Sequence, residues 1–339
     1  MSDLPSLSLI SAATAAFLAY AGIAGVIGLL KRRALAKPNQ RSSHTLPTPQ
    51  GGGVVVVPAV LVSAGVALTL SGSKLPGGAF YLWVVGTAAL ALTIIGFVDD
   101  MRALSVPSRL ASQILAVAAA VVLMPADLRI FPPIVPLPLE RAALICAGLW
   151  FVNLFNFMDG IDLISATETG AIALGILILT GVDAMPPAYG IVALALIGAM
   201  AGFAPWNWPP ARLFLGDAGS IPIGFLLAVL LIHLASINAF AATIIPLYYF
   251  ADATITLGRR VFRGERVWEA HRQHFYQQAT ANGLTVMQTV RRIALLDALL
   301  IALAVAAAIG GSLWIGTVCL IAAGGAVGWT LHTFARGPR

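Results

Sequence analysis

Aspartate and asparagine side chains occur in this chain at points where long apolar runs begin or end. GFVDD (Gly96–Asp100) closes one run, NLFNFMDGID (Asn153–Asp162) closes a second, and LGDAGS (Leu215–Ser220) opens a third. Adjacent carboxylates repel each other, and a bound cation relieves that repulsion. Mg²⁺ is held by one or two carboxylates and completes its shell with water and substrate phosphates. The pattern therefore predicts a site for Mg²⁺ and a diphosphate.

Not every acidic residue belongs to this pattern. Five do, because each lies beside Gly, Asn or another aspartate at the end of an apolar run: Asp99, Asp100, Asp159, Asp162 and Asp217. Glu168, Glu265 and Glu269 are expected to be loop residues that balance nearby basic side chains. Asp252 lies about five residues inside an apolar run, so roughly 8 Å deep at 1.5 Å per residue. For Asp252, an ion pair with a neighbouring Arg and a direct role in the chemistry are both open.

The elements that must position these side chains are membrane-spanning helices. The chain has 339 residues, of which 59% are hydrophobic and 10% are charged. A soluble domain has about 45–50% apolar and about 25% charged residues, so this composition excludes a soluble globular protein, a disordered chain and a coiled coil. Backbone polar groups cannot stay unpaired in lipid, so the spans are helices. We predict an all-α, polytopic membrane bundle that forms a single domain over residues 1–339.

Eleven apolar runs are long enough to cross the bilayer, with ten as the alternative count, because a span takes about 20 apolar residues. The predicted spans are residues 9–30, 53–71, 79–98, 108–124, 141–158, 169–183, 187–204, 220–236, 239–257, 292–309 and 313–334. The break near Ile237 and Asn238 is the least distinct. The active site is expected on the loops 31–52, 99–107, 159–168, 205–219 and 258–291.

The basic residues predict the orientation. Seventeen of the 20 Lys and Arg residues fall in loops on one side, whereas Lys74, Arg129 and Arg141 fall on the other. The positive-inside rule places the N-terminus outside and the C-terminus in the cytoplasm. Basic residues follow the first run instead of preceding it, so that run is expected to be a spanning helix and not a cleavable signal peptide. Nucleic-acid binding is not expected, and two cysteines inside apolar runs disfavour a disulfide framework.

Four segments in a fixed order carry a resemblance to a known family. They are GFVDD, NLFNFMDGID, NWPPARLFLGDAGS (Asn207–Ser220) and WEAHRQHFYQ (Trp268–Gln277). From about Arg41 to Arg292 the chain resembles the polyprenyl-phosphate N-acetylhexosamine-1-phosphate transferases, glycosyltransferase family 4. This family includes the enzymes that start O-antigen and common-antigen synthesis and the phospho-N-acetylmuramoyl-pentapeptide transferase. The resemblance implies ten or eleven helices in the bacterial cytoplasmic (inner) membrane, with the active site facing the cytoplasm.

The activity that this resemblance implies is transfer of an N-acetylhexosamine 1-phosphate from a UDP-sugar to undecaprenyl phosphate. UMP leaves, and the polyprenyl-diphosphate sugar begins O-antigen or another cell-envelope polysaccharide. The family requires Mg²⁺, for which Mn²⁺ is expected to substitute. The implied partners are the UDP-sugar, undecaprenyl phosphate and the lipid bilayer, and a homodimer is compatible with the sequence. A membrane transporter of an anionic solute is the alternative function.

The matching motifs also imply roles for single residues. Asp217 matches the principal Mg²⁺ ligand of the family, and Asn156 matches an asparagine that contributes to the same metal site. Asp99 and Asp100 match the pair that the family places beside the lipid phosphate. The residues implied in catalysis are Asp99, Asp100, Asp159 and His274.

Six further residues are implied in substrate binding: Asn153, Asp162, Asn207, Phe214, Arg272 and His44. Asp162 and Asn207 match residues that contact the uracil. Phe214 matches an aromatic residue that stacks on the base, with a lipid-facing or core Phe as the alternative. Arg272 is expected to bind the pyrophosphate, because guanidinium groups contact phosphates bidentately.

The last of the four segments departs from the family pattern. Many bacterial members read D-R-Q-H-I-H-H there, and this chain reads HRQHFYQ. His274 matches the first His, whereas Tyr276 and Gln277 replace the other two, which disfavours the pentapeptide-transferring branch. UDP-GlcNAc is the simplest donor, and a UDP-linked 6-deoxy amino sugar is the alternative. Direct attack by the lipid phosphate is favoured over a route through an aspartyl-phosphate.

Overall fold

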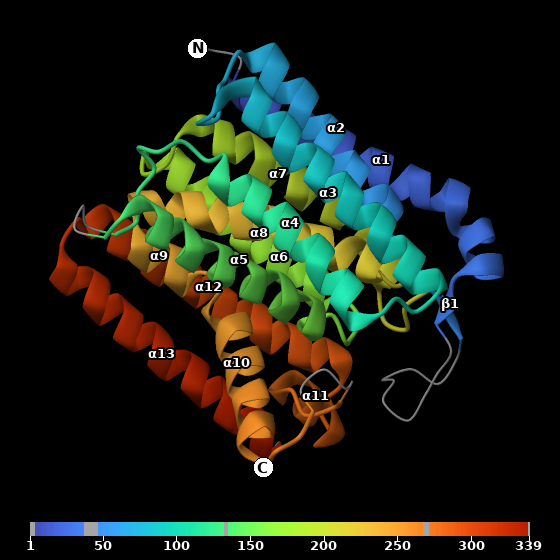
Figure 1. Cartoon of the computed structure of the whole chain (residues 1–339). Coiled ribbons are helices and arrows are strands. Elements are labelled where there is room, and N and C mark those ends of the chain that lie inside the picture. Colours follow the sequence, from blue (N-terminus) through green and yellow to red (C-terminus); the bar gives the residue numbers. More distant parts are fainter. Residues whose placement is uncertain (1–3, 37–46, 132–134, 267–270, 338–339) are drawn as a thin grey trace.

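The computed structural model describes residues 4–36, 47–131, 135–266 and 271–337, and most of them are helical (Figure 1). The helices of this part are α1 (Leu4–Arg33), α2 (Gly53–Ser71), α3 (Gly78–Met101), α4 (Val106–Val122), α5 (Leu137–Met158), α6 (Ile164–Gly181), α7 (Pro187–Asn207), α8 (Asp217–Ile237), α9 (Ala239–Ile244), α10 (Leu247–Phe262), α11 (Phe275–Ala281), α12 (Val286–Gly310) and α13 (Leu313–Arg336). The strands β1 (Leu35–Ala36) and β2 (Thr48–Pro49) form a small antiparallel pair.

Nine helices within the described ranges are long and apolar enough to cross a membrane. They are α1, α2, α3, α5, α6, α7, α8, α12 and α13. The apolar helix α4 is shorter, although it coincides with a predicted span. The prediction of a polytopic, all-α membrane bundle is therefore confirmed. The count of eleven spans and the orientation of the two termini stay predictions.

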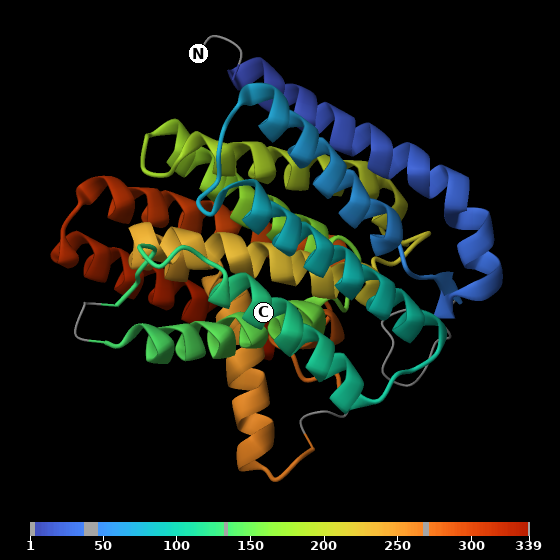
Figure 2. The same cartoon turned by 45° about the horizontal axis from the view of Figure 1, so that its top comes forward.

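The predicted span 239–257 is wrong as a single helix. The chain instead forms the short helix α9, turns at Ile245 and Pro246, and continues as α10. Pro246 has no amide N–H to donate, and its ring clashes with the preceding helical turn, which favours a break there. The break at Asn238 is confirmed, because this residue ends α8 and its side chain caps α9 by accepting from Ala241 N at 2.8 Å. Figures 1 and 2 show α10 projecting from the bundle at an angle to the other helices.

Glycines allow the closest contacts between helices. A Cβ added to Gly198 of α7 would lie 2.1 Å from the carbonyl oxygen of Ala12 in α1. A Cβ added to Gly53 of α2 would lie 2.1 Å from the backbone nitrogen of Gly219 in α8. Small residues let helix backbones approach closely in lipid, where no hydrophobic force drives helices together. Both helix pairs therefore depend on glycine at these positions.

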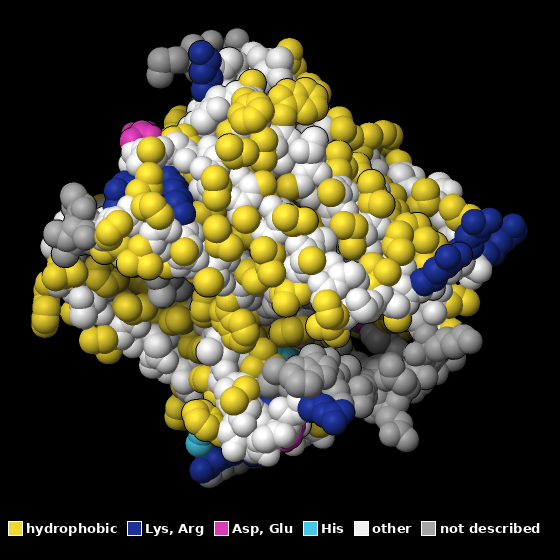
Figure 3. Space-filling view, viewed as in Figure 1, with side chains coloured by type: hydrophobic (Ala, Val, Ile, Leu, Met, Phe, Trp, Pro, Cys, Tyr) yellow, Lys and Arg dark blue, Asp and Glu magenta, His cyan; other side chains and the backbone are white. Residues whose placement is uncertain are grey.

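α8 is the centre of the bundle. Its residues are buried without interruption from Ala218 to Leu234, and α2, α3, α5 and α9 pack around it. The outer surface is apolar in turn: Figure 3 shows hydrophobic side chains over most of one face, with Lys and Arg at its edges. This distribution is the one expected for a bundle that is surrounded by lipid.

The loops at the amino end of α8 are joined by backbone hydrogen bonds. Phe214 N donates to Pro49 O at 2.9 Å, Gly52 N donates to Phe214 O at 3.0 Å, and Gly53 N donates to Leu215 O at 3.0 Å. The Gly-rich segment before α2 therefore lies directly against the LGD motif. This contact holds the start of α8 in place.

Glu168 is not a loop residue, contrary to the expectation from the sequence. α6 begins at Ile164, so Glu168 lies in its second turn, where it is completely buried. The predicted loop 159–168 is therefore wrong beyond its first few residues. Hydropathy misplaced this segment because it counts every glutamate against a membrane helix, whereas SATETG continues an apolar helix that is covered by its neighbours.

Candidate active site

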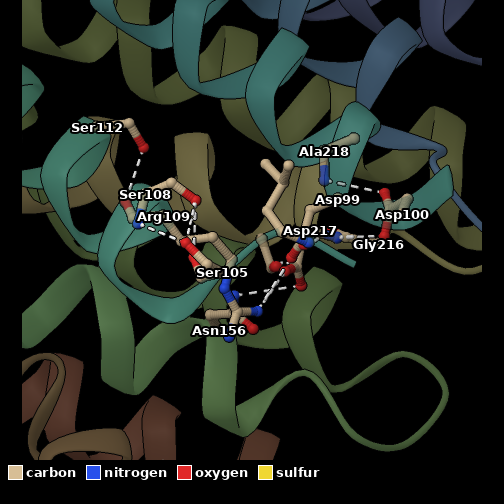
Figure 4. A network of polar contacts seen from close by, with 12 residues as sticks. Asp99, Asp100, Ser105, Ser108, Arg109, Ser112, Asn156, Gly216, Asp217 and Ala218 are labelled. Atoms are coloured by element: carbon tan, nitrogen blue, oxygen red, sulfur yellow. Dashed lines mark hydrogen bonds and ion pairs between the residues drawn. The ribbon is translucent and has the colours of Figure 1, made fainter. Parts of the chain in front are cut away.

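The carboxyl end of α3 and the amino end of α8 touch, and this contact builds the site (Figure 4). A Cβ added to Gly96 would lie 2.3 Å from the carbonyl oxygen of Asp217, so only glycine permits the approach. Asp99 and Asp100 follow Gly96 within one turn, and Asp217 is the first residue of α8. Two motifs that are more than 100 residues apart in the chain thus meet at one point.

Arg109 lies between two carboxylates of this contact. Its Nη1 is 3.0 Å from Asp99 Oδ2 and 3.5 Å from Asp217 Oδ2. Arg109 is in the first turn of α4, which the Ser105 side chain caps. Asn156, from the last turn of α5, donates from Nδ2 to Asp217 Oδ1 at 3.3 Å. Four helices each contribute one side chain to this group of Asp99, Arg109, Asn156 and Asp217, which we call the aspartate cluster.

Asp100 accepts hydrogen bonds from backbone N–H groups and not from the side chains of the aspartate cluster. Its Oδ1 accepts from Asp217 N at 3.0 Å and its Oδ2 accepts from Ala218 N at 3.1 Å. A carboxylate at this place satisfies the first free N–H groups of a helix and interacts favourably with the helix dipole. Gly216, at φ 73°, makes room for it, since a Cβ there would lie 2.4 Å from Asp100 Oδ2. We therefore infer that Asp100 positions Asp217 by capping α8.

Asp100→Ala is expected to lower both stability and activity. Loss of a capping side chain costs about 0.5–2 kcal/mol, and the start of α8 carries Asp217, so a fall in the thermal midpoint should accompany the fall in turnover. Asp100→Asn keeps one acceptor and should lie between the wild type and Asp100→Ala in both measurements. Asp127→Ala, at an exposed acidic residue, is the control. Full loss of activity at unchanged stability would contradict the capping role and place Asp100 against a substrate.

Two loops beside the aspartate cluster are locked together by side chains that bond to backbone. Asp162 Oδ2 accepts from Ala211 N at 3.0 Å. Asn207 Oδ1 accepts from Leu163 N at 2.6 Å, and its Nδ2 donates to Leu213 O at 2.9 Å. The MDGID loop (NFMDGID, Asn156–Asp162) and the segment NWPPARLFLGD (Asn207–Asp217) therefore form one structural unit, which we call the MDGID unit. The contacts of Asp162 and Asn207 with uracil stay predictions, and the structure adds that both side chains hold the loops in shape.

Asp159 lies in the same unit, between α5 and α6. Its Oδ1 accepts from Ser165 Oγ at 2.6 Å. Burial raises the pKa of the Asp159 carboxyl to about 6, and the neighbouring Asp162 acts in the same direction, whereas the hydrogen bond from Ser165 opposes the shift. At neutral pH the group is therefore mostly ionised, with a pKa close to the range in which a general base works well.

Three other residues are predicted to contact the substrate, namely Asn153, Phe214 and His44. Asn153 donates from Nδ2 to Gln113 Oε1 at 2.8 Å, which ties α5 to α4 one turn before Asn156. Phe214 is partly exposed on the loop that precedes α8. His44 lies outside the described residues. None of the three roles is decided by these positions.

Asp252 anchors the segment that leads into α11, a function that the sequence left open. It is completely buried. Its Oδ1 accepts from Phe275 N at 3.0 Å and lies 3.1 Å from His274 Nδ1, and its Oδ2 accepts from Tyr276 N at 3.1 Å. Among the described residues the basic side chain beside Asp252 is thus a histidine and not an arginine. The only indication of this role in the sequence was the depth of Asp252 inside an apolar run, because a buried carboxylate needs hydrogen-bond donors.

The same segment contacts the MDGID loop through an aromatic residue. A Cβ added to Gly160 would lie 2.0 Å from the hydroxyl oxygen of Tyr276, and that hydroxyl donates to Phe157 O at 3.3 Å. Tyr276 is completely buried and its ring stacks on His274, with 5.6 Å between the ring centroids. The residue that replaces a family histidine therefore braces the loop that carries Asp159.

The basic side chains of this segment differ in charge and exposure. His271 stacks on His274 at 4.8 Å. Burial, together with the charges of His274 and Arg260, lowers the pKa of His271 to about 4, so this imidazole is neutral at neutral pH. Arg272 is exposed. Of His271 and Arg272, only Arg272 therefore offers a charged group for a phosphate.

The aspartate cluster fits a magnesium ion by its chemistry. Asp99 and Asp217 both lie within 3.5 Å of one cationic nitrogen, which shows that a single positive charge can serve both carboxylates. Hard oxygen donors from one or two carboxylates, completed by an amide, water and substrate phosphate, suit Mg²⁺. The described part of the chain holds no group of three or more His, Cys, Asp or Glu that could bind a metal. Asp217 and the amide oxygen of Asn156 would hold the ion, with Asp99 beside them.

Comparison with known proteins finds a family that is similar to the part of the chain that carries this site. Residues 82–235 match the family described as glycosyl transferase family 4. The match covers the whole aspartate cluster and the MDGID unit, and it ends before Asp252 and His274, so the anchor of the last segment lies outside the matched residues.

The chain is also similar to several bacterial transferases. It is 31% identical over 215 residues to the decaprenyl-phosphate N-acetylglucosaminephosphotransferase of Mycobacterium tuberculosis, covering 58% of this chain and 52% of that protein. It is 28% identical over 271 residues to a phospho-N-acetylmuramoyl-pentapeptide-transferase of a Mycobacterium species, covering 64% and 74%. It is 24% identical over 279 residues to the probable undecaprenyl-phosphate N-acetylglucosaminyl 1-phosphate transferase of Bacillus subtilis, covering 77% and 74%. The chain thus spans about half the length of the mycobacterial N-acetylglucosamine enzymes.

Proposed function

We propose that the chain transfers an N-acetylhexosamine 1-phosphate from a UDP-sugar to a polyprenyl phosphate and releases UMP. The observation that carries this proposal is the aspartate cluster, where two carboxylates, an amide and an arginine meet at the ends of four helices. Phosphoryl transfer depends on positioning and charge neutralisation, and this cluster offers both. The family match and the names of the relatives support the same reaction.

The donor is proposed to lie across the aspartate cluster, with its nucleotide toward the MDGID unit. Asp217 and Asn156 would hold Mg²⁺, which would neutralise the diphosphate and stabilise UMP as it leaves. Arg109 now neutralises Asp99 and Asp217. With an ion bound there, the Arg109 guanidinium would be free to contact a phosphate.

The acceptor needs little activation. A phosphate monoester has a second pKa near 6, so most of the polyprenyl phosphate is a dianion at neutral pH. Its oxygen attacks the β-phosphorus of the donor, the bond from that phosphorus to the UMP oxygen breaks, and the electron pair leaves on UMP. Asp99, whose side chain is 7% exposed, is proposed to orient the acceptor and to take any remaining proton.

Donor and pathway are proposed from the relatives. Two of the bacterial relatives are named for N-acetylglucosamine and for decaprenyl or undecaprenyl phosphate, so we propose UDP-GlcNAc and undecaprenyl phosphate as substrates. The enzyme would start an O-antigen or another envelope polysaccharide. It would act in the bacterial inner membrane with its site toward the cytoplasm.

The transporter alternative finds less support in the geometry. Transporter sites usually lie near the membrane midplane between broken helices. The aspartate cluster instead lies where α3 and α5 end and where α4 and α8 begin. This position suits a soluble nucleotide sugar that meets a lipid phosphate at the membrane boundary.

A donor panel tests the proposed function. Purified protein in detergent with undecaprenyl phosphate and Mg²⁺ is given UDP-GlcNAc, a UDP-linked 6-deoxy N-acetyl sugar or UDP-N-acetylmuramoyl-pentapeptide, and UMP release is measured. We expect release with the first donor, dependent on both acceptor and Mg²⁺, and none with the pentapeptide donor. Release that does not need the lipid phosphate, or none with any donor, would contradict the proposal.

A further inference from the structure

Two acidic side chains lie inside the bundle away from the aspartate cluster. Glu168 is in the second turn of α6 and is 0% exposed, and Asp297 is in the middle of α12 and is 2% exposed. α6 and α12 pack against each other. Asp297 is the charged group that acts on Glu168. The two carboxyl groups therefore share one apolar surrounding between two helices that are apolar enough to span a membrane.

Neither carboxyl group has a partner in the described part of the chain. All four oxygens, Oε1 and Oε2 of Glu168 and Oδ1 and Oδ2 of Asp297, lack a hydrogen bond there. No Lys, Arg or His of those residues forms an ion pair with either group or acts on it electrostatically. A buried ionised carboxylate without a partner is strongly unfavourable, so buried acids in membrane helices are normally paired or bind an ion.

A third side chain with a buried oxygen comes from α10. Tyr249 is completely buried, and its hydroxyl has no hydrogen-bond partner among the described residues. Glu168 is the charged group that acts on this hydroxyl most strongly, ahead of Asp159, and the Ser165 hydroxyl interacts with it outside hydrogen-bonding geometry. The Tyr249 ring packs against Phe155, with 5.4 Å between centroids, which limits its movement. A neutral oxygen donor is thus fixed beside the acidic pair, independently of the two acids.

We propose that Glu168, Asp297 and Tyr249 bind a sodium ion between α6, α12 and α10. Hard cations take oxygen ligands from carboxylates and other oxygen groups, and this place offers oxygen from three helices. One Na⁺ neutralises one carboxylate while the other keeps a proton, so the buried site carries no net charge. A monovalent ion suits the pair, since two carboxyl groups that share one proton carry a single negative charge.

The ion would stabilise the frame of the proposed active site without touching a substrate. α6 follows directly on the MDGID unit, and α10 carries Asp252, the anchor of the last segment. A bound ion that joins α6, α10 and α12 would fix the position of the MDGID unit relative to the segment that Asp252 anchors. The inference concerns stability and stands whether or not the proposed transfer reaction is correct.

Thermal unfolding in matched salts tests this proposal. The purified chain in a non-ionic detergent is heated in NaCl, KCl or choline chloride at equal ionic strength, at pH 8 and with no Mg²⁺, and tryptophan fluorescence is followed. We expect Na⁺ at about 150 mM to raise the midpoint by about 3 °C over choline, because a ligand stabilises the state that binds it. Glu168→Gln and Asp297→Asn should each lose this difference, and Asp183→Asn, at an exposed acid, should keep it.

A direct binding measurement covers the case in which the variants fail to fold. Radioactive sodium should bind the wild type at about one ion per chain, and unlabelled NaCl but not choline chloride should displace it. Equal midpoints in all three salts, with no sodium retained, would overturn the proposal. A midpoint that follows pH identically in NaCl and choline chloride would also overturn it, because the pair would then hold only protons.

Discussion

Asp217→Asn is expected to abolish transfer while the helical bundle stays folded. Asp217 is the first residue of α8 and one of two carboxylates that face Arg109. The amide keeps the size of the side chain and its contact with Asn156 but loses the charge that would hold Mg²⁺ and balance Arg109. Removing one group that stabilises developing charge lowers kcat by about 10²–10³-fold, and a principal metal ligand should cost at least that. UMP release at saturating Mg²⁺ is the measurement.

Two comparisons make the Asp217 result specific. Asp127→Asn removes an acid of the same type from an exposed position and should leave both turnover and thermal midpoint unchanged. The midpoint of Asp217→Asn should stay near that of the wild type, since Asp100 still caps α8 through backbone groups. Turnover within about tenfold of wild type would remove Asp217 from the metal site.

Asp252→Ala is expected to destabilise the protein and inactivate it together. The carboxylate is acceptor for Phe275 N and Tyr276 N, contacts His274 Nδ1, and accepts from the hydroxyl of Tyr248 at 3.3 Å. Removing an acceptor leaves each buried donor unsatisfied at a cost of about 1–3 kcal/mol, and this carboxylate serves several donors. The segment into α11 should then leave the MDGID loop, against which Tyr276 packs.

Thermal unfolding and limited trypsin digestion report the two effects of Asp252→Ala separately. Cleavage after the exposed Arg272 should become faster as the segment detaches. Asp252→Asn, which keeps one acceptor oxygen, should lie between Asp252→Ala and the wild type. Asp127→Asn, at an exposed acidic residue, is the control and should change the midpoint little, because exposed charges contribute about 0–1 kcal/mol. If Asp252→Ala melts and cuts like the wild type, Asp252 does not anchor the segment.

Hydropathy predicted the helices well because a membrane-spanning segment needs only a long apolar run. Hydropathy missed the break between α9 and α10 because a proline in an apolar run ends the helix at some positions and is tolerated at others. Pro58, Pro205 and Pro222 lie inside α2, α7 and α8 without ending them, whereas Pro246 lies at a break. What decides between these outcomes is how neighbouring helices cover the freed carbonyls, and the sequence does not contain that information.

The motifs predicted which residues meet but not what each one contacts. Asp99 and Asp100 are the same residue type at adjacent positions, and they point about 100° apart around α3 because a helix has 3.6 residues per turn. Asp99 therefore reaches Arg109, whereas Asp100 reaches the backbone of α8. No motif in the sequence joined Asp252 to His274, since the two residues lie in different elements that are connected by a loop. Glu168 was misassigned because burial between α6 and α12 leaves no trace in hydropathy.

The fate of the two donor phosphates tests the proposed reaction most directly. The protein is incubated with undecaprenyl phosphate, Mg²⁺ and UDP-GlcNAc that carries a label on either the α- or the β-phosphate, and the products are divided between organic solvent and water. Sugar 1-phosphate transfer predicts that the β-label enters the lipid fraction and that the α-label stays in water as UMP. A β-label that remains in water as UDP, while the sugar enters the lipid, would show simple glycosyl transfer and contradict the role assigned to the aspartate cluster.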